Sequence, residues 1–165
     1  MIFSKGCIYA IRASLYLASG EQGGFMPIRE ISKGLGLSHH FLTKILQHLT
    51  QAGLLNSMRG TQGGVTLARS PSEIRLEEIV VAIDGRDLFE ACILGLPGCG
   101  TRAPCPMHEQ WSGLRTQVHT LFATYTLADL SRKIQEGSLD IKDLLNESFK
   151  LQTTSENTHQ TENTR

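Results

Sequence analysis

Apolar residues near the start of the chain recur at the three- and four-residue intervals that are typical of a helix. The residues at these intervals are Ile8, Ile11, Leu15 and Ala18. They predict a first helix with one buried face, which ends before Gly20 because glycine is a poor helix former. A shorter pattern of the same kind, Ile28, Ile31 and Leu35, follows Pro27 and stops at Gly36. It predicts a second helix, since proline suits the first helical turn.

A third helix is predicted from Ser38, whose hydroxyl can cap a helix N-terminus, to Gly53, which favours a helix end. Its apolar positions form one face, made of Phe41, Leu42, Ile45, Leu46 and Leu49. The opposite face is polar and carries His39, His40, Thr43, Lys44, Gln47 and His48. Two helices joined by a glycine-containing turn, the second with an exposed polar face, are typical of a helix-turn-helix.

Two short runs after this helix predict a β-hairpin. Residues 54–58 and 65–69 flank the glycine-rich segment Arg59-Gly60-Thr61-Gln62-Gly63-Gly64. A hairpin that follows a helix-turn-helix is the wing of a winged helix. We therefore expect a mainly α fold with a small β-wing, and we assign residues 1–75 to a winged-helix DNA-binding domain.

The exposed face of the third helix and the wing have the chemistry of a DNA interface. Thr43, Lys44 and Gln47 can reach base edges or phosphates, and the helix carries no carboxylate that would repel them. Arg59 lies where a wing can enter a minor groove. The full candidate set is Ser38, His39, His40, Thr43, Lys44, Gln47, Arg59 and Gln62. Winged helices also serve as protein–protein modules, so a solvated surface without a DNA role is the second interpretation.

Charge is divided unevenly although the net charge is zero. Residues 1–75 hold eight Lys or Arg against three Asp or Glu, which is +5, and residues 76–165 hold eight against thirteen, which is −5. The basic half suits a polyanion, unless the distribution is accidental.

No apolar run approaches the ~18 residues of a membrane span and no secretory signal precedes the first helix, so we expect a cytoplasmic protein. Structural disulfides are rare there, which favours ligand or redox roles for the cysteines.

The second region, residues 76–150, is predicted to contain further helices. Leu76, Ile79, Val80 and Ile83 predict one, with Glu77 and Glu78 at its favourable N-terminal end. A long helix that opens near Pro106 carries a heptad seam of Trp111, Leu114, Val118, Leu121 and Tyr125. We expect this seam to pack against a second copy in a homodimer, with packing on its own domain as the alternative. Short helices are expected at 126–130 and 141–149, and residues 151–165 form a polar tail predicted to be disordered.

Three of the four cysteines lie in one glycine- and proline-rich stretch that ends at a histidine: Cys92, Cys99, Cys105 and His108. A flexible loop of this composition can fold three thiolates and an imidazole around one centre. Structural zinc usually has its cysteines in C-x₂₋₄-C pairs, which are absent here, whereas the wider spacing suits an iron–sulfur cluster. The spacing leaves an iron–sulfur cluster, a zinc ion and redox-active thiols as candidates.

The chain resembles the IscR/NsrR family of bacterial transcription regulators over about residues 1–135. The segments that carry the resemblance are 3–6, 41–46, 59–64, the cysteine loop and 126–130. The resemblance implies homodimers with paired winged helices, a long dimerisation helix and, in members with three cysteines, an iron–sulfur cluster that tunes DNA binding. Residues 105–111 are most similar to the branch in which a histidine just after the third cysteine is the fourth ligand. This likeness implies that His108 completes the set with Cys92, Cys99 and Cys105.

Ile8 stands where some members of this family carry an acidic ligand, so the resemblance implies no such ligand from the first helix. The neighbouring Cys7 is interpreted as a small buried hydrophobe, and a part in the site is the alternative.

Three functions follow from these observations. The first is a dimeric DNA-binding regulator controlled by a two-iron or four-iron cluster, which by its two-fold symmetry calls for an inverted-repeat operator. The second is a cluster-free regulator that uses thiol oxidation or zinc, and the third is a small iron–sulfur electron carrier. We expect no enzyme, because paired carboxylates and a nucleophile–base pair are absent, and residues 60–64 lack the context of a phosphate loop.

Overall fold

The computed structural model describes residues 2–20, 24–60, 63–100 and 103–137. Gln62, the helix predicted at 141–149 and the predicted tail at 151–165 lie outside these ranges. The described residues form helices with one two-stranded antiparallel sheet, which confirms the predicted fold class. The elements are α1 (Lys5–Ala18), α2 (Ile28–Leu35), α3 (His39–Gln51), β1 (Leu55–Met58), β2 (Gly64–Leu67), the 3₁₀ turn η1 (Pro71–Glu73), α4 (Leu76–Asp84), α5 (Asp87–Glu90), α6 (His108–Thr124) and α7 (Leu127–Glu136).

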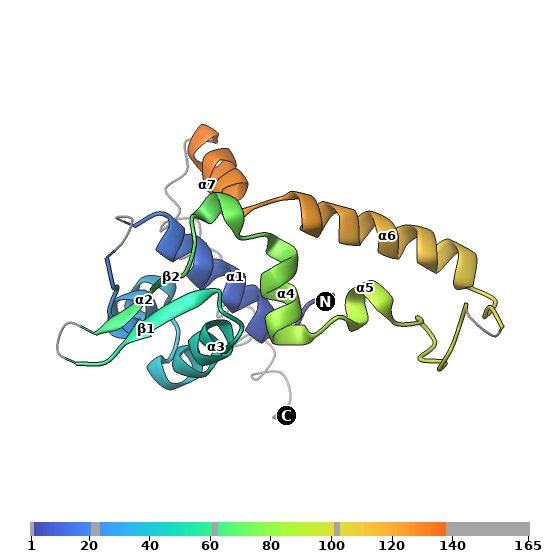
Figure 1. The fold of residues 1–165 in the computed structure, drawn as a ribbon, viewed down its shortest axis with the longest axis horizontal. Helices are drawn as coiled ribbons and strands as arrows, with labels where there is room; N and C mark the ends of the chain where they lie inside the picture. The colour runs from blue at the N-terminus through green and yellow to red at the C-terminus, as the bar shows by residue number, and fades with distance from the viewer. Residues whose placement is uncertain (1, 21–23, 61–62, 101–102, 138–165) are drawn as a thin grey trace, which may run out of the picture.

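Helices α2 and α3 form the predicted helix-turn-helix (Figure 1). Helix α2 ends at Gly36, which adopts the left-handed conformation with φ 63°, and the buried Ser32 hydroxyl donates to the Leu37 carbonyl across the turn at 2.6 Å. The Ser38 hydroxyl then accepts a hydrogen bond from the Phe41 amide at 3.2 Å and caps α3. The local signals in the sequence therefore give the correct bounds of both helices to within a residue or two.

The wing is the hairpin of β1 and β2, in which Leu55 pairs with Leu67 and Met58 pairs with Gly64. Met26 extends the pairing on the outer side of β2, because its amide and carbonyl both bond to Val65 at 2.9 Å. This close approach requires glycine at position 64, where a Cβ would lie 2.1 Å from the Met26 carbonyl oxygen. The chain before α2 thus fixes the wing against the helix-turn-helix.

The buried face of α1 differs from the predicted one. Leu15 is buried as expected, but Ile8, Ile11 and Ala18 are only half-buried. The side chains that enter the core instead are mostly small or lie between the predicted positions: Cys7, Ala10, Ala13, Ser14, Tyr16 and Leu17. Helix α1 contacts α2, α3, α4 and α7, so neighbouring backbones approach it from several sides. Small side chains allow this close packing, which a single apolar stripe does not predict.

Phe41 is the second departure, because its side chain is 40% exposed rather than buried. Its ring meets the Tyr9 ring edge-on at 5.8 Å, at the margin between α3 and α1. The other predicted core residues of α3 are buried: Leu42, Ile45, Leu46 and Leu49. This core continues past residue 75, since Leu76, Ile79 and Leu127 join it. The division of the chain at residue 75 stays a prediction.

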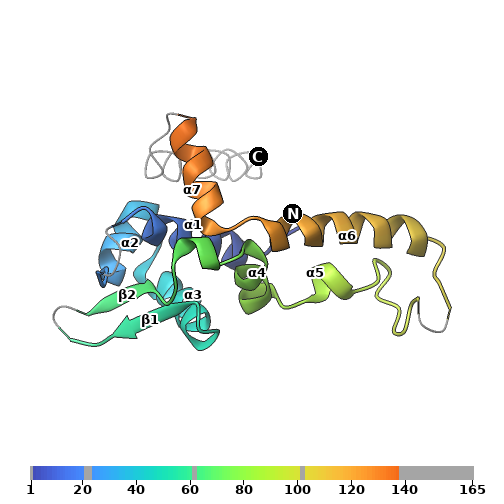
Figure 2. The same ribbon diagram turned by 45° about the horizontal axis from the view of Figure 1, so that its top comes forward.

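An arm projects from this body. We use the name arm for residues 87–124, which comprise α5, the cysteine loop (residues 91–107) and α6. Figures 1 and 2 show α6 extending away from α1, with α5 and the cysteine loop folded back along it. The cysteine loop lies at the far end of the arm, and the wing lies at the opposite end of the molecule.

Helix α6 begins at His108, two residues later than the predicted opening at Pro106. Residues 106 and 107 form a turn instead, and the His108 amide donates to the Cys105 carbonyl at 3.0 Å. The predicted heptad seam divides. Val118 packs against a small core of Cys7, Val80 and Phe89, whereas Leu114 and Leu121 are 56% and 52% exposed. All of α6 is described, and none of its residues is fully buried.

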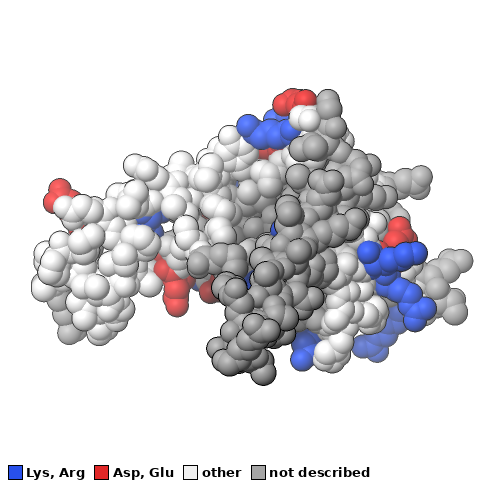
Figure 3. Space-filling model, turned by 180° about the vertical axis from the view of Figure 1, so that it is seen from behind, with Lys and Arg blue, Asp and Glu red and all other residues white. Residues whose placement is uncertain are grey.

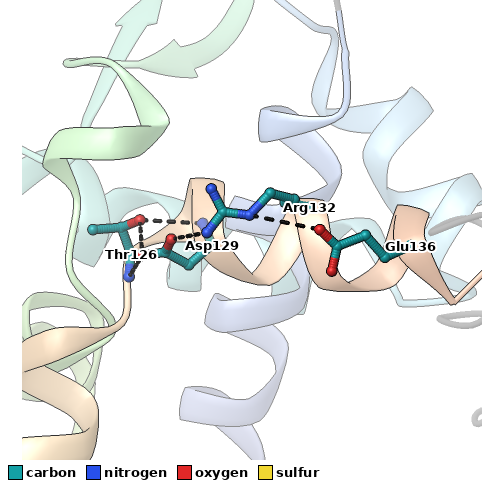
Figure 4. Close-up of polar contacts among 4 residues, drawn as sticks. All are labelled: Thr126, Asp129, Arg132 and Glu136. Carbon is teal, nitrogen blue, oxygen red and sulfur yellow. Dashed lines mark hydrogen bonds and ion pairs between the residues drawn. The ribbon is translucent and has the colours of Figure 1, made fainter.

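The arm returns to the body through a short antiparallel contact between Arg75 and Thr126. The Leu76 amide donates to the Tyr125 carbonyl and the Leu127 amide donates to the Ile74 carbonyl, each at 3.0 Å. Helix α7 follows at once and runs to Glu136, six residues beyond the predicted end at residue 130. Its start is fixed by a capping box in which Thr126 and Asp129 bond reciprocally, and Arg132 links Asp129 to Glu136 along the helix (Figure 4). Among the described helices, none has the length and apolar character needed to cross a membrane.

Candidate metal centre and nucleic-acid interface

The cysteine loop gathers three sulfur atoms. The Sγ atoms of Cys92, Cys99 and Cys105 all lie within 4.8 Å of one another, and those of Cys92 and Cys105 are 3.7 Å apart. Cys105 is buried, and Cys92 and Cys99 are half-buried. The Cys105 amide donates to the Cys99 sulfur at 3.4 Å, so backbone as well as side chains converges on the centre. The loop therefore presents three soft donors at one point, although six and five residues separate them in sequence.

The loop backbone also changes the acidity of these thiols. The amides of Leu96 and Leu94 donate to the Cys92 sulfur and lower the pKa of that thiol to about 7. Hydrogen bonds from backbone amides stabilise the thiolate, which is the form that binds metals. Burial acts in the opposite direction on Cys105, whose pKa is raised. Near neutral pH, Cys92 is therefore the thiol of this pair that ionises first.

His108 lies beside this group at the first residue of α6. Its Nδ1 atom is 3.2 Å from the Cys99 Sγ, and the side chain is half-buried. Gly100 also lies close to the imidazole. The three cysteines that the sequence singled out are thus brought together, whereas His108 contacts one of them, Cys99, and a place for it as fourth ligand stays a prediction.

Two side chains of α6 hold the beginning of the cysteine loop. The Trp111 Nε1–H donates to the Ala91 carbonyl at 2.9 Å. The Arg115 guanidinium donates to the same carbonyl at 3.0 Å and to the Glu90 carbonyl at 2.7 Å. The residue just before Cys92 is therefore fixed to the helix that carries His108. The sequence does not predict this support, because its pattern places Trp111 only in the heptad seam.

The donor set fits an iron–sulfur cluster or a thiophilic metal ion. Three thiols are soft ligands and the nearby imidazole of His108 is a borderline one, and among the described residues the group of mutually close ligand atoms contains only the three cysteines. Cys7 is not a member either. It is fully buried on α1 against Val80 and Phe89, and burial together with the charge of Asp84 raises its pKa to about 12. A thiol in this environment is inert, which agrees with its interpretation as a buried hydrophobe.

A groove of about 690 Å³ lies between α3 and the wing. Four of the predicted DNA-contacting residues line it, namely His39, Thr43, Gln47 and Arg59. Ser38 is used as the helix cap, His40 and Lys44 are exposed on α3 outside the groove lining, and Gln62 lies outside the described residues. The groove therefore joins polar side chains of the helix to the loop end of the wing, which is the arrangement expected of a winged helix that reads DNA.

Arg29 also lines this groove, and the sequence reasoning missed it. It precedes the recognition helix by ten residues, on the first turn of α2, and only the fold brings it beside Thr43 and Arg59. The available signal was its place next to Ile28 at an outward-facing position of the helix-turn-helix. A guanidinium here adds a phosphate-binding or base-reading group to the interface.

Thr43 has a restricted hydrogen-bonding role. Its hydroxyl donates to the His39 carbonyl one turn earlier at 2.7 Å. Because that hydrogen is engaged, the side chain offers acceptor lone pairs and a methyl group to a ligand. In a major groove these groups match the amino groups of adenine and cytosine and the methyl group of thymine.

Positively and negatively charged residues lie mainly at different ends of the molecule. Figure 3 shows Lys and Arg gathered mainly at the end of the molecule that carries α2, α3 and the wing, whereas Asp and Glu dominate toward the arm. The exposed basic residues of this end include Arg29, Lys33, Lys44 and Arg59. A basic end opposite a thiol-rich end separates a surface for a polyanion from a site for a metal group.

Comparisons with known proteins agree with this arrangement. The sequence profile of the Rrf2 family, described as iron-dependent transcriptional regulators, matches residues 3–133. An HTH-type transcriptional regulator of Aquifex aeolicus is 32% identical over 132 residues, which cover 79% of this chain and 91% of that protein. The HTH-type transcriptional regulator IscR of Serratia proteamaculans is 33% identical, with 77% of this chain and 76% of that protein covered.

Solved structures show the same fold. The structure of T. potens IscR superposes with a TM-score of 0.65 at 26% identity, covering 83% of this chain and 90% of that one. CymR of B. subtilis, described as a global cysteine regulator, superposes with a TM-score of 0.67 over 79% of this chain and 96% of that one. Its 24% identity supports the fold alone.

Proposed function

Because the chain belongs to the Rrf2 family of iron-dependent transcriptional regulators, we propose that it is a dimeric, cytoplasmic DNA-binding regulator whose operator affinity is controlled by an iron–sulfur cluster. The family and the relatives are transcription regulators rather than enzymes. The observation that carries the cluster part of the proposal is the convergence of the Cys92, Cys99 and Cys105 sulfur atoms within 4.8 Å, with His108 beside them.

The DNA-binding surface of the proposal is the face of α3 and the wing. Thr43 and Gln47 reach base edges, while Lys44 and Arg29 neutralise phosphate charge, and Arg59 reaches from the wing toward a minor groove. Ser38, His39, His40 and Gln62 complete the predicted set. A two-fold dimer places two such surfaces on one side of the duplex, so the operator is an inverted repeat.

Dimerisation is assigned to α6. Its outward side carries Leu114 and Leu121, which are more than half exposed, and a shallow groove along Thr116, Thr120 and Leu121 adds to the same side. Two large apolar side chains one heptad apart on a projecting helix are typical of a surface that a second helix covers. The lining of this groove contains no Asp, Glu, Lys or Arg, which supports a second copy as the occupant.

The cluster ligands are Cys92, Cys99, Cys105 and His108. When bound, the cluster supplies a centre that responds to redox state, nitric oxide or cluster supply. The chain's own part is to couple that centre to DNA. Trp111 and Arg115 tie the loop to α6, and His119 of α6 contacts Glu77 of α4 at 2.9 Å. Helix α4 in turn holds Arg69 at the base of the wing through Glu78, which connects the arm to the DNA-binding surface.

A cluster-free regulator that binds zinc or oxidises its thiols is the alternative, and the 3.7 Å separation of the Cys92 and Cys105 sulfur atoms favours it over the electron carrier. A zinc site needs no iron or inorganic sulfide, and a thiol switch needs no metal. Anaerobic reconstitution, followed by absorption spectra and assays of iron and sulfide, separates these possibilities. Mössbauer spectra distinguish a two-iron from a four-iron cluster.

The decisive experiment compares cluster-loaded and cluster-free protein on one operator. The operator is first selected from genomic fragments with each form, and each form is then titrated against it. We expect affinities that differ about fivefold to 150-fold, which is the usual range of allosteric coupling. Replacing Cys99 by Ala should remove both the cluster and the difference, while Cys7→Ala, a buried cysteine outside the group, should keep both. Equal affinities of the cluster-loaded and cluster-free protein on every selected sequence would contradict control of DNA binding by the cluster.

A further inference from the structure

We propose that Gly100 is a positioning residue for His108, and that the missing side chain at position 100 is what lets the imidazole reach Cys99 at the edge of the sulfur group. This inference rests on the proposed function, because it assigns His108 a place in the cluster site. A Cβ atom at position 100 would lie 2.3 Å from the His108 Cε1, 2.9 Å from Nε2 and 3.3 Å from Nδ1. Atoms that are not bonded to each other do not approach so closely, so a methyl group and the imidazole cannot both keep these positions.

The imidazole lies close to two consecutive residues of the cysteine loop. Its Nδ1 is 3.2 Å from the Cys99 sulfur, and its Cε1 is the ring atom nearest to where a Cβ at Gly100 would lie. Nothing larger than a hydrogen atom fits between Gly100 and the ring. The loop therefore aims the ring at the sulfur group by contact, in addition to the direction given by α6.

The ring, rather than the loop, is expected to yield to a methyl group at position 100. The loop backbone is tied at this point, because the Gly100 amide bonds to the Ala103 carbonyl at 3.4 Å and Cys99 forms a bridge with Ala103. The imidazole is the end of a side chain that can rotate about two bonds. Rotation away from position 100 changes the distance between Nδ1 and Cys99, so a methyl group should remove the fourth ligand while leaving the cysteines in place.

A substitution at Gly100 also strains the backbone, since its φ is +90°. The chain offers a matched control for this effect. Gly95 lies in the same loop with φ +65°, and a Cβ there would meet nothing within 4 Å. Gly95→Ala therefore introduces a methyl group at a left-handed glycine of the loop without touching the imidazole.

The first test measures the rate of cluster loss to a chelator, at several pH values, in Gly100→Ala, Gly95→Ala, His108→Ala and the double variant Gly100→Ala/His108→Ala. We expect Gly100→Ala to accelerate loss about tenfold, as His108→Ala does, with Gly95→Ala much closer to the original protein. Both fast variants should lose the acid sensitivity that a bound imidazole brings. When His108 is already replaced by alanine, Gly100→Ala should increase the rate of cluster loss no more than Gly95→Ala does.

The second test needs no cluster. In the reduced, metal-free protein, NMR should show a nuclear Overhauser effect between the Gly100 Hα protons and the His108 Hε1 proton. The imidazole resonances should shift in Gly100→Ala and stay in place in Gly95→Ala. Equal effects of the two alanine variants, or independent effects of Gly100→Ala and His108→Ala, would overturn the inference. A protein that binds no cluster but shows these NMR signals would refute the proposed function and leave the contact with Gly100 established.

Discussion

The Trp111 indole N–H donates to the Ala91 carbonyl at 2.9 Å, which joins α6 to the residue before Cys92. This hydrogen bond fixes the distance between the start of the cysteine loop and the helix that begins at His108. The Arg115 guanidinium reaches the same carbonyl at 3.0 Å. The geometry of the sulfur group is therefore maintained from outside the loop by α6. The side of α6 that carries Leu114 and Leu121 is exposed and is the side proposed to contact a second copy.

Trp111→Phe should weaken this support without removing the aromatic ring. The variant loses one hydrogen bond, but Arg115 still bonds to the Ala91 carbonyl, so we expect a decrease of about 1 kcal/mol in the free energy of unfolding. We also expect faster cluster loss. Urea unfolding of the metal-free protein and the decay of visible absorbance measure the two effects. Ser112→Ala, which removes a hydroxyl from the same helix away from the proposed dimer surface, is the control, and an identical cluster lifetime in all three proteins would contradict the role of Trp111.

Thr43→Ala and Lys44→Ala should affect DNA binding in different ways. If Thr43 reads a base, its loss changes the preference at one operator position by about 1–3 kcal/mol. That position should be adenine, cytosine or thymine, because the Thr43 hydroxyl hydrogen already bonds to the His39 carbonyl. Lys44 is exposed, and if it contacts phosphate as proposed, its loss should weaken binding to all sequences and reduce the salt dependence.

Arg59→Ala should mainly reduce the affinity for operators with A·T-rich segments beside the half-sites, because a narrow minor groove attracts a guanidinium. Fluorescence anisotropy with operator variants measures all three effects. Arg132→Ala is the control for loss of a positive charge, since Arg132 lies on α7 and pairs with Asp129 at 2.7 Å. The recognition face is wrongly assigned if Thr43→Ala, Lys44→Ala and Arg59→Ala all bind like the original protein.

Leu114→Glu or Leu121→Glu should dissociate the dimer. Each change puts a charge where two helices are proposed to bury carbon, and burying an unpaired charge costs several kcal/mol. Both residues are exposed in the single chain, so the monomer should still fold. Sedimentation velocity measures the association, and circular dichroism checks the fold. Met58→Glu makes the same exchange at an exposed residue of the wing and should leave the association unchanged; a dimer that survives Leu114→Glu and Leu121→Glu would place the interface elsewhere.

His108→Cys should retain a cluster with a lower reduction potential. A thiolate adds one negative charge compared with a neutral imidazole, and negative charge disfavours the reduced cluster. The cluster should also become less sensitive to acid, because protons compete with iron for an imidazole. Spectroelectrochemistry gives the potential and absorbance decay between pH 6 and pH 8 gives the sensitivity. A spectrum and lifetime untouched by His108→Ala would exclude the histidine from the site.

In the metal-free reduced protein, Cys92 should react first with iodoacetamide. Its pKa of about 7 means that the thiolate forms as the pH rises through 7, so its rate should rise and level off near there. Burial raises the pKa of Cys105, so its thiolate forms at a higher pH and its rate should still be rising where that of Cys92 has levelled off. Below pH 7 Cys92 should therefore react faster than Cys105, even though the more acidic thiolate is the weaker nucleophile. Peptide mapping by mass spectrometry measures each rate, with buried Cys7 as the internal unreactive control; equal rates at Cys92 and Cys105 would be contrary to this expectation.

The parts of the fold that depend on local chemistry could be predicted from the sequence. Ser38 caps a helix and Gly36 ends one wherever the rest of the chain lies, so the helix-turn-helix and the wing were recognisable. The face of α1 could not be predicted, because both the large apolar residues and the small ones at Ala10 and Ala13 lie at helical spacing. Only the number of neighbouring helices decides which set is buried.

The candidate site, like the fold, has some features that the sequence predicts and others that depend on tertiary contacts. The spacing of Cys92, Cys99, Cys105 and His108 suggested one centre because a loop of glycine and proline can close. The contributions of Arg29, Gly100 and the Trp111–Ala91 hydrogen bond depend on tertiary contacts between distant or differently oriented segments. The seam of α6 was recognisable as apolar, but its division between Val118 inside and Leu114 outside follows from where α4 and α5 pack.

The backbone contact between Arg75 and Thr126 makes the arm an insertion whose two ends lie close together on the body. The polypeptide departs at the end of α4 and rejoins the body at Tyr125, where two backbone hydrogen bonds of 3.0 Å seal the junction. Backbone bonds of this kind do not depend on which side chains the insert carries. We therefore expect residues 87–124 to tolerate changes in length and sequence away from Phe89, Val118 and Phe122, which pack against the body, while the surface proposed to read DNA keeps its core.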